Sequence, residues 1–423
     1  MNEKPVIVVG GGLIGVTTLY ELVSRNIPAV LLEGRNGLAE ETSFANGGML
    51  TPSMPDPWNG PGVLGHLLSS VFDPHSAMKL RLHAIPGLSI WGLQFLRNAS
   101  KDRHRAATQA NYLLSAYSKY LMDELRGRLD LDYDSSSLGT MKVFPTEEAM
   151  GRPIAIAEML KSLGLRFEIL DREETIKVEP QLGNVKEKIA GALRFPDDGS
   201  GDAHLFALAI AQQAVAAGGE IRTGVSVRRL LADGARITGV ETAEGPIQGS
   251  RVILANGVFA PQLALSVGVR LPIKPAKGYS ATLDMTGFKE VPKVPIIDDA
   301  MHAAVVPLGT RLRFAGTAEF TGYDTQIRQD RVDNLFGLFE RLYPDLAVKV
   351  DRNQMQGWAG LRPISADGKA FIGESRIEGL WINAGHGHLG WTMAVGSAAL
   401  LVDLMSCERP RVDVMPFSPR RIS

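Results

Sequence analysis

The 423-residue chain carries 45 Lys and Arg residues against 46 Asp and Glu residues, so its net charge of −1 gives no electrostatic basis for nucleic-acid binding. A chain of this length can bury the cores of two domains. Its single cysteine, Cys407, excludes an internal disulfide and a cysteine-based metal cluster, and no metal site is expected. The apolar run Gly396–Met405 is short and contains Asp403, so no membrane span is predicted.

A glycine-rich turn stands between two apolar segments near the start of the chain. Residues 6–15 read Val-Ile-Val-Val-Gly-Gly-Gly-Leu-Ile-Gly, a helical pattern follows, and a second apolar run ends at Glu33, about 20 positions beyond the glycines. This order is typical of a dinucleotide-binding βαβ unit. Gly10 permits the turn, Gly12 lets a pyrophosphate approach the backbone, and Gly15 lets the helix pack on the sheet.

The acidic residue and the helix start indicate which nucleotide is bound. Free N–H groups and the positive dipole end of the helix attract phosphates. Glu33 is expected to accept hydrogen bonds from ribose hydroxyls, and its charge disfavours a 2′-phosphate, which leaves FAD or NAD. The run Val6–Val16 also resembles a signal-peptide core. We reject that interpretation because only Lys4 precedes the run and because it contains four glycines.

Residues 34–62 form a long irregular segment rich in Gly, Asn, Ser and Pro, which includes Glu41–Met49 and Pro55–Gly62. A loop this long is unusual inside a compact domain and often has a binding role. Its small hydroxyl residues and paired glycines can offer backbone N–H groups to a phosphate or to the edge of an isoalloxazine ring. We interpret it as part of a cofactor site, with an ordinary surface loop as the alternative.

The pattern from Leu64 to Asp130 is helical, with helices predicted at 77–96 and 112–125. The first part is rich in apolar and basic residues. It is interpreted as a helix pair packed on the neighbouring domain, with contact to a membrane surface as the alternative. The apolar and basic residues that suggest contact with a membrane surface are Leu67, Leu68, Val71, Phe72, Lys79, Arg81, Ile90, Trp91, Leu93, Phe95, Leu96 and Arg97.

The middle of the chain alternates short strands with helices, which are predicted at 146–163, 204–217 and 328–343. The alternating block at 271–317 predicts an antiparallel sheet with one face forming a site. Turn residues separate the short strands, which are predicted at 139–144, 166–170, within 191–202, and at 220–225, 227–231, 237–242 and 251–255.

Near the C-terminus, residues 380–394 read as a strand, a Gly/His loop and a helix. A helix start at such a loop can stabilise negative charge on a reduced flavin at N1 and O2, which favours FAD over NAD. The predicted fold class is therefore α/β, with a Rossmann-like FAD-binding domain interleaved with an α+β substrate domain built on an antiparallel sheet. The FAD-binding domain is predicted at 1–62, 191–260 and 351–423, and the substrate domain at 63–190 and 261–350.

Several motifs stand in order along the chain: the first glycine turn, Glu41–Gly48, Pro57–Trp58, Lys277–Ser280, Gly316–Glu319, Gly360–Pro363 and Gly385–Thr392. Together they resemble the D-amino acid dehydrogenase small subunit family, within the wider D-amino acid oxidase and glycine oxidase group. The resemblance spans essentially the whole chain. It implies a two-domain flavoprotein that oxidises D-amino acids to imino acids, which hydrolyse to 2-oxo acids and ammonia, with electrons passed to a membrane quinone or another carrier.

The resemblance also implies roles for individual residues. Arg362 matches the arginine that binds the substrate carboxylate, a task that suits the guanidinium fork. His388 matches a second polar or basic substrate contact, with a packed loop histidine as the alternative, and Tyr279 and Tyr323 are candidates for the active-site wall. The implied flavin contacts are Gly10, Gly12, Leu13, Ile14, Gly15, Glu33, Gly34, Arg35, Thr42, Ser43, Gly47, Gly48, Met49, Val227, Ala255, Gly257, Gly360, Gly387, Leu389, Gly390 and Thr392.

The expected reaction is hydride transfer from Cα to flavin N5, with Arg362 holding the carboxylate and no strong general base required. FAD is expected to be non-covalent, because Cys407 lies far from the flavin motifs. The open alternatives are an oxygen-using oxidase for glycine, sarcosine or a D-amino acid, a D-proline-type dehydrogenase subunit, and a catalytically silent flavin-binding subunit. We expect a cytoplasmic protein, with peripheral attachment to the inner face of the cell membrane left open.

Overall fold

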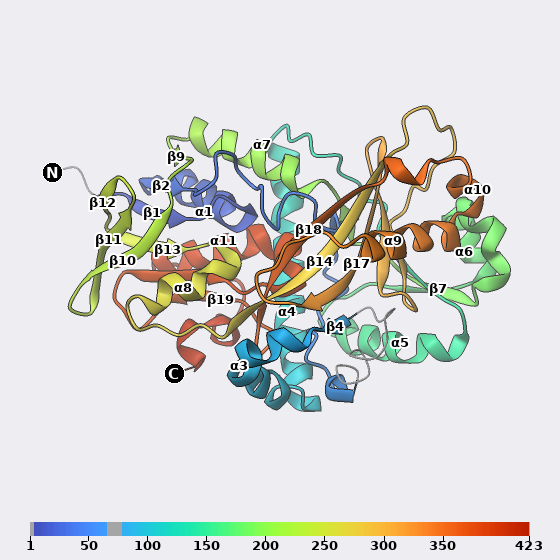
Figure 1. The fold of residues 1–423 in the computed structure, drawn as a ribbon, viewed down its shortest axis with the longest axis horizontal. Helices are drawn as coiled ribbons and strands as arrows, with labels where there is room; N and C mark the ends of the chain where they lie inside the picture. The colour runs from blue at the N-terminus through green and yellow to red at the C-terminus, as the bar shows by residue number, and fades with distance from the viewer. Residues whose placement is uncertain (1–3, 66–77, 423) are drawn as a thin grey trace.

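The computed structural model describes residues 4–65 and 78–422, and two large sheets organise them (Figure 1). The first sheet has six strands in the order β19-β20-β13-β1-β2-β9, all parallel except for the antiparallel β19–β20 pair. Its strands are β1 (Val6–Val9), β2 (Ala29–Leu32), β9 (Glu220–Arg222), β13 (Arg251–Leu254), β19 (Phe371–Glu374) and β20 (Leu380–Ala384).

Four helices share one hydrophobic core with this sheet: α1 (Leu13–Ser24), α4 (Lys101–Arg128), α7 (Ala203–Ala216) and α11 (Gly390–Met405). α11 lies directly against α1, where the Thr17 hydroxyl donates to the Ala394 carbonyl at 3.2 Å. The opposite core contains a small sheet and a short helix, namely β10 (Val227–Asp233), β11 (Arg236–Thr242), β12 (Gly245–Gln248) and α8 (Ala260–Leu265).

The second sheet has nine strands, and their order is β18-β14-β17-β16-β15-β5-β7-β6 with β4 paired to β17. Helix α9 (Gln329–Leu342) covers one face through Phe336 and Phe339, while α5 (Glu147–Lys161) packs near β5 and β7. The strands are β4 (Met78–Leu80), β5 (Thr140–Phe144), β6 (Glu168–Asp171), β7 (Gly191–Phe195), β14 (Ile273–Asp284), β15 (Ile296–Asp298), β16 (Ala303–Leu308), β17 (Arg311–Phe320) and β18 (Gln356–Ser365).

The structure corrects the predicted domain limits. Helix α4, which lies within the range assigned to the substrate domain, packs in the core of the first sheet. Residues 191–195 and 356–365 were assigned to the FAD-binding domain, but they form β7 and β18 of the nine-stranded sheet, paired with β5 and β14. Both errors have one cause: the partner strands are distant in sequence, and a strand's own pattern does not identify the sheet that it joins. The sheet is also mixed rather than purely antiparallel, because β5–β15 and β4–β17 are parallel.

The predicted helix at 77–96 is wrong at its start. Its first described residues form β4, and the helix itself is α3 (Ile85–Arg97). Trp91 and Phe95 of α3 are buried against the nine-stranded sheet. Ile90 and Leu93 of the same helix are 75% and 72% exposed. Leu67, Leu68, Val71, Phe72 and Ala77 lie outside the described residues.

Within the described ranges, Gly387–Met405 is the one helical segment that meets the length and hydropathy of a membrane span, with a mean hydropathy of 1.3. Of its apolar window, 83% is buried inside the fold between α1 and α4. This segment, which the sequence analysis did not count as a span, is therefore a core helix of the first sheet.

Shorter elements complete the described chain. They are β3 (Met49–Leu50), β8 (Gly199–Ser200), α6 (Arg172–Val178), α10 (Pro344–Ala347), and 3-10 turns at Leu82–Ala84, Pro180–Lys188, Gly257–Phe259, Arg352–Gln354, Gly387–Leu389, Met415–Phe417 and Pro419–Ile422.

Candidate active site

The glycine turn after β1 forms the start of α1, where the Leu13 amide donates to the Ser43 hydroxyl at 3.1 Å. α1 begins after Gly12, and a Cβ on Gly15 would lie 1.7 Å from the Gly10 carbonyl oxygen, so only glycine allows this helix to pack here. The carboxylate of Glu33 accepts from the Gly11 amide at 2.6 Å, which places it beside the turn. This part of the βαβ prediction is therefore confirmed, because strand, turn, helix and acidic residue converge as the sequence indicates.

A cavity of about 1570 Å³ runs along this turn and reaches the face of the nine-stranded sheet. Ligand pockets usually measure about 300–1000 Å³, so this one has room for a dinucleotide and a small substrate together. The start of α1, the loop at 42–49 and the Gly/His loop at 387–390 all border it. Both helix starts proposed from the sequence, before α1 and before α11, thus open on the same space.

Most of the residues predicted to contact cofactor or substrate line this cavity, but four do not. Gly15 and Thr392 serve packing, since Gly15 faces the Gly10 carbonyl and the Thr392 hydroxyl accepts from the Thr51 amide at 3.1 Å. Leu389 is buried in the core of the first sheet. Tyr323 is 43% exposed, and its hydroxyl donates to the Val258 carbonyl at 3.3 Å, so it is not part of the wall.

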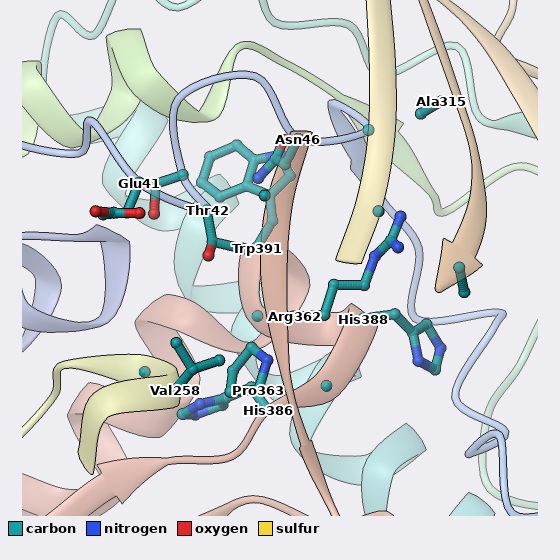
Figure 2. A pocket seen from close by; sticks show the side chains of 18 of the residues that line it. Glu41, Thr42, Asn46, Val258, Ala315, Arg362, Pro363, His386, His388 and Trp391 are labelled. Atoms are coloured by element: carbon teal, nitrogen blue, oxygen red, sulfur yellow. The ribbon is translucent and has the colours of Figure 1, made fainter. Parts of the chain in front are cut away.

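Arg362 of β18 points into the cavity (Figure 2). Its guanidinium lies over Gly278 of β14, where a Cβ would come within 1.9 Å of Nη1, and it donates to the Thr317 carbonyl at 3.1 Å. Thr317 has a φ of 55°, which is rare for a β-branched residue and marks local strain. The backbone of two neighbouring strands therefore shapes the position of this one cation.

No carboxylate in the described part of the chain forms an ion pair with Arg362. Burial lowers the pKa of its guanidinium to about 10, which leaves it charged at neutral pH. A buried charge without a partner is costly, and a bidentate carboxylate is the ligand that a guanidinium fork fits best. The site is thus built to receive an anion from the cavity.

Tyr279 forms part of the cavity wall, but its hydroxyl is already engaged. It donates to the buried carboxylate of Glu319 at 2.9 Å, and Arg81 and Arg331 bind the other oxygen at 2.6 and 3.1 Å. Burial and the Glu319 charge raise the pKa of Tyr279. Tyr279 therefore offers the cavity its ring rather than a free hydroxyl.

His388 and Trp58 stand beside Arg362. The imidazole of His388 stacks on the Trp58 indole with centroids 5.7 Å apart and planes 12° apart, and the Arg362 guanidinium carbon is 5.6 Å from the same indole centroid. Figure 2 shows Arg362 and His388 on one side of the cavity. Trp58 was not among the predicted contacts, although its place in a long Pro- and Gly-rich loop was a usable signal.

The loop around Trp58 has no regular structure and is held by buried side chains. Asp198 accepts from the hydroxyl of Ser53 at 2.5 Å and from that of Thr140 at 2.6 Å. The Asn111 amide donates to the Pro55 carbonyl at 3.0 Å. These contacts fix an irregular segment against both sheets.

The residues of the cavity fit FAD. When FAD is bound, Glu33 would hold a ribose, the start of α1 would face the pyrophosphate, and the segments at 42–49 and 387–390 would offer amides and small residues to the flavin ring. Within the described ranges, no group of three His, Cys, Asp or Glu residues is placed to hold a metal ion.

The βαβ unit, the second sheet and the cation between them define an oxidoreductase that binds a dinucleotide cofactor. The chain belongs to the FAD-dependent oxidoreductase family, whose model matches residues 5–404. Its curated relatives include a D-amino acid dehydrogenase from Bradyrhizobium diazoefficiens, 35% identical over 98% of both chains. Another, from Paramagnetospirillum magneticum, is 37% identical over 95% of this chain and 94% of the relative.

Solved structures confirm the fold. A glycine oxidase from Geobacillus kaustophilus has a TM-score of 0.75 at 24% identity and covers 100% of this chain and 99% of its own. An L-proline dehydrogenase from P. horikoshii has a TM-score of 0.78 at 17% identity and covers 99% of this chain and 98% of its own. The predicted α/β fold with a Rossmann-like half is therefore confirmed.

Proposed function

We propose that the protein catalyses the FAD-dependent oxidative deamination of D-amino acids to 2-oxo acids and ammonia and passes electrons to a quinone or another non-oxygen acceptor. The observation that carries the substrate class is Arg362 at the end of the FAD cavity, which pairs with no carboxylate in the described part of the chain. The guanidinium of Arg362 can bind a carboxylate, and the cavity beside it leaves space for an amine. The names of the curated relatives support the same substrate class.

The chain's own residues contribute mainly orientation. Arg362 binds the carboxylate, and the strained Thr317 carbonyl together with Gly278 fixes the guanidinium that does so. Tyr279 and Trp58 provide an apolar wall that excludes water from the reacting carbon. FAD, when bound, supplies the acceptor for the hydride of Cα. Holding the substrate in one orientation accounts for a large part of such a rate enhancement.

The test is anaerobic. The yellow protein is mixed with a panel of D- and L-amino acids, glycine and sarcosine while the flavin absorbance is recorded, and air or a quinone is then admitted. Bleaching by D-amino acids that reverses only with the quinone is the expected result. Rapid recovery in air contradicts the proposed acceptor, and absence of bleaching contradicts the proposed substrate class.

We further propose that the acceptor is a membrane quinone and that α3 attaches the protein to the inner face of the cell membrane. Leu82, Ile85, Ile90 and Leu93 are 66%, 42%, 75% and 72% exposed on the 3-10 turn and helix of this segment. Exposed basic residues stand at the end of α3 and just after it, which suits an anionic lipid surface. They are Arg97, Lys101, Arg103 and Arg105. The buried side of α3 shares a cluster with Val63 and Trp58, so this surface lies next to the cavity.

The double variant Ile90→Glu, Leu93→Glu is expected to bind vesicles of phosphatidylethanolamine and phosphatidylglycerol at least about tenfold more weakly, because burial of each apolar side chain contributes about 1.5–3 kcal/mol. Co-sedimentation measures this binding. The matched control is Val348→Glu, Met415→Glu, whose native side chains are 83% and 70% exposed elsewhere. Equal binding of both variants contradicts the proposed surface, and unchanged flavin bleaching by substrate shows that the site is intact.

A further inference from the structure

The hydrogen bond of His388 determines which ring nitrogen is free. Nε2 lies 3.3 Å from the Met54 carbonyl oxygen. A carbonyl oxygen only accepts, so Nε2 carries the hydrogen and the lone pair of the neutral ring is on Nδ1. Burial lowers the pKa of His388, the Arg362 charge lowers it further, and the Asp56 carboxylate and the Met54 carbonyl oppose this lowering. The ring is therefore mostly neutral at pH 7.

Nδ1 of His388 is available to a ligand. His388 lines the cavity, and within the described part of the chain its only hydrogen-bond partner is Met54. Neither ring nitrogen of His388 is both buried and without a hydrogen-bond partner. Nε2 of the nearby His386, by contrast, is buried and has no partner among the described residues. Nδ1 is consequently accessible on a residue that lines the cavity, and stacking on Trp58 holds the ring in one orientation.

Trp58 also fixes this nitrogen relative to the carboxylate site, because the same indole contacts the Arg362 guanidinium. If the proposed function holds, a substrate whose carboxylate is bound by Arg362 places its ammonium group within the space that both side chains border. Desolvation in this cavity disfavours the ammonium form. The reaction therefore needs a neutral nitrogen beside the ammonium group that can accept its proton.

We infer that Nδ1 of His388 accepts the proton that the substrate ammonium must lose before its C=N bond forms. In this step one N–H bond of the ammonium breaks, its electron pair remains on the nitrogen as the lone pair of a neutral amine, and a new Nδ1–H bond forms. The imidazolium is then balanced by Asp56, and the proton leaves to solvent when product dissociates. His388 is thus a catalytic residue in addition to Arg362.

The pH profile of kcat/KM tests this role. With His388 as acceptor, kcat/KM of the native enzyme is expected to be nearly flat across about pH 6.5–8.5. His388→Gln keeps an N–H that can reach the Met54 carbonyl but removes the basic nitrogen. Only substrate that is already deprotonated then reacts, so kcat/KM is expected to rise about tenfold per pH unit and to approach the native value at high pH.

His104→Gln is the matched control. Its Nε2 is bonded to the Pro57 carbonyl of the same loop at 3.2 Å, and His104 does not line the cavity. It is expected to follow the native pH profile. Binding of propanoate, which has the carboxylate but no amine, is measured from the flavin spectrum and is expected to be unchanged in His388→Gln.

Two results are decisive. A loss in His388→Gln that is the same at every pH, or one that His104→Gln shares, contradicts the role of Nδ1 while native activity on D-amino acids still supports the proposed function. If the native protein is not reduced by D-amino acids but propanoate still perturbs its flavin, the proposed function fails and the inference falls with it.

Discussion

Replacement of Arg362 by alanine is expected to lower kcat/KM for the best D-amino acid by about 10²–10⁴-fold. The guanidinium can make two charge-assisted hydrogen bonds to a carboxylate, each contributing about 1.5–3 kcal/mol, and a tenfold change corresponds to about 1.4 kcal/mol. The loss should appear in the rate of flavin bleaching under anaerobic stopped-flow conditions. FAD content is expected to remain native, since all predicted cofactor contacts except Gly360 lie on elements other than β18.

Arg362→Lys separates charge from geometry in this experiment. Lysine keeps the positive charge but lacks the planar fork, so it is expected to recover only part of the loss. Wild-type affinity and rate in Arg362→Ala would show that the carboxylate binds elsewhere. Full activity in Arg362→Lys would show that orientation by two hydrogen bonds is unnecessary.

The second large effect is expected from Gly278→Ala, which adds one methyl group under the guanidinium of Arg362. The new Cβ would lie 1.9 Å from Nη1, so the guanidinium must leave its position and its bond to Thr317. The backbone of β14 need not move, because the clash is with the end of a flexible side chain. We expect at least about a 10²-fold loss in kcat/KM, since one misplaced positioning group can cost that much.

Gly337→Ala provides the control for this variant. Gly337 lies in α9, and a Cβ there would meet nothing within 4 Å. It is expected to keep full activity and to gain slightly in thermal stability, because alanine is favoured over glycine in a helix by about 1 kcal/mol. Near-native activity in Gly278→Ala would show that the position of Arg362 is not critical. A large drop in its melting temperature would show that the effect lies in the fold.

The nucleotide-binding half could be predicted because its determinants are local. Gly10, Gly12 and Glu33 are separated by short, fixed spacings, and each has a role set by backbone geometry. The assignment of strands to sheets could not be predicted in the same way. β7 and β18 carry ordinary strand patterns, and only pairing with partners about 50–80 positions away along the chain places them.

The substrate end of the site was accessible only through resemblance. Arg362 lies in a strand with an ordinary sequence pattern. It is distinguished by having no carboxylate partner in the described part of the chain, and a sequence does not show such a feature. Tyr323 was wrongly placed on the wall because the resemblance that suggested it does not reveal its exposure. Trp58 was missed as a contact because its role depends on Arg362 and His388, which are far away along the chain.

The packing of α11 on α1 also determines when the cofactor can be captured during biosynthesis. The fingerprint glycines are translated before two elements that complete their surroundings, because helix α11 (residues 390–405) packs on their helix and β20 joins the sheet from residues 380–384. Such long-range closure is slow and leaves intermediates exposed until it is complete. A nascent chain thus displays the glycine motif before the elements that complete the pocket around it have been made.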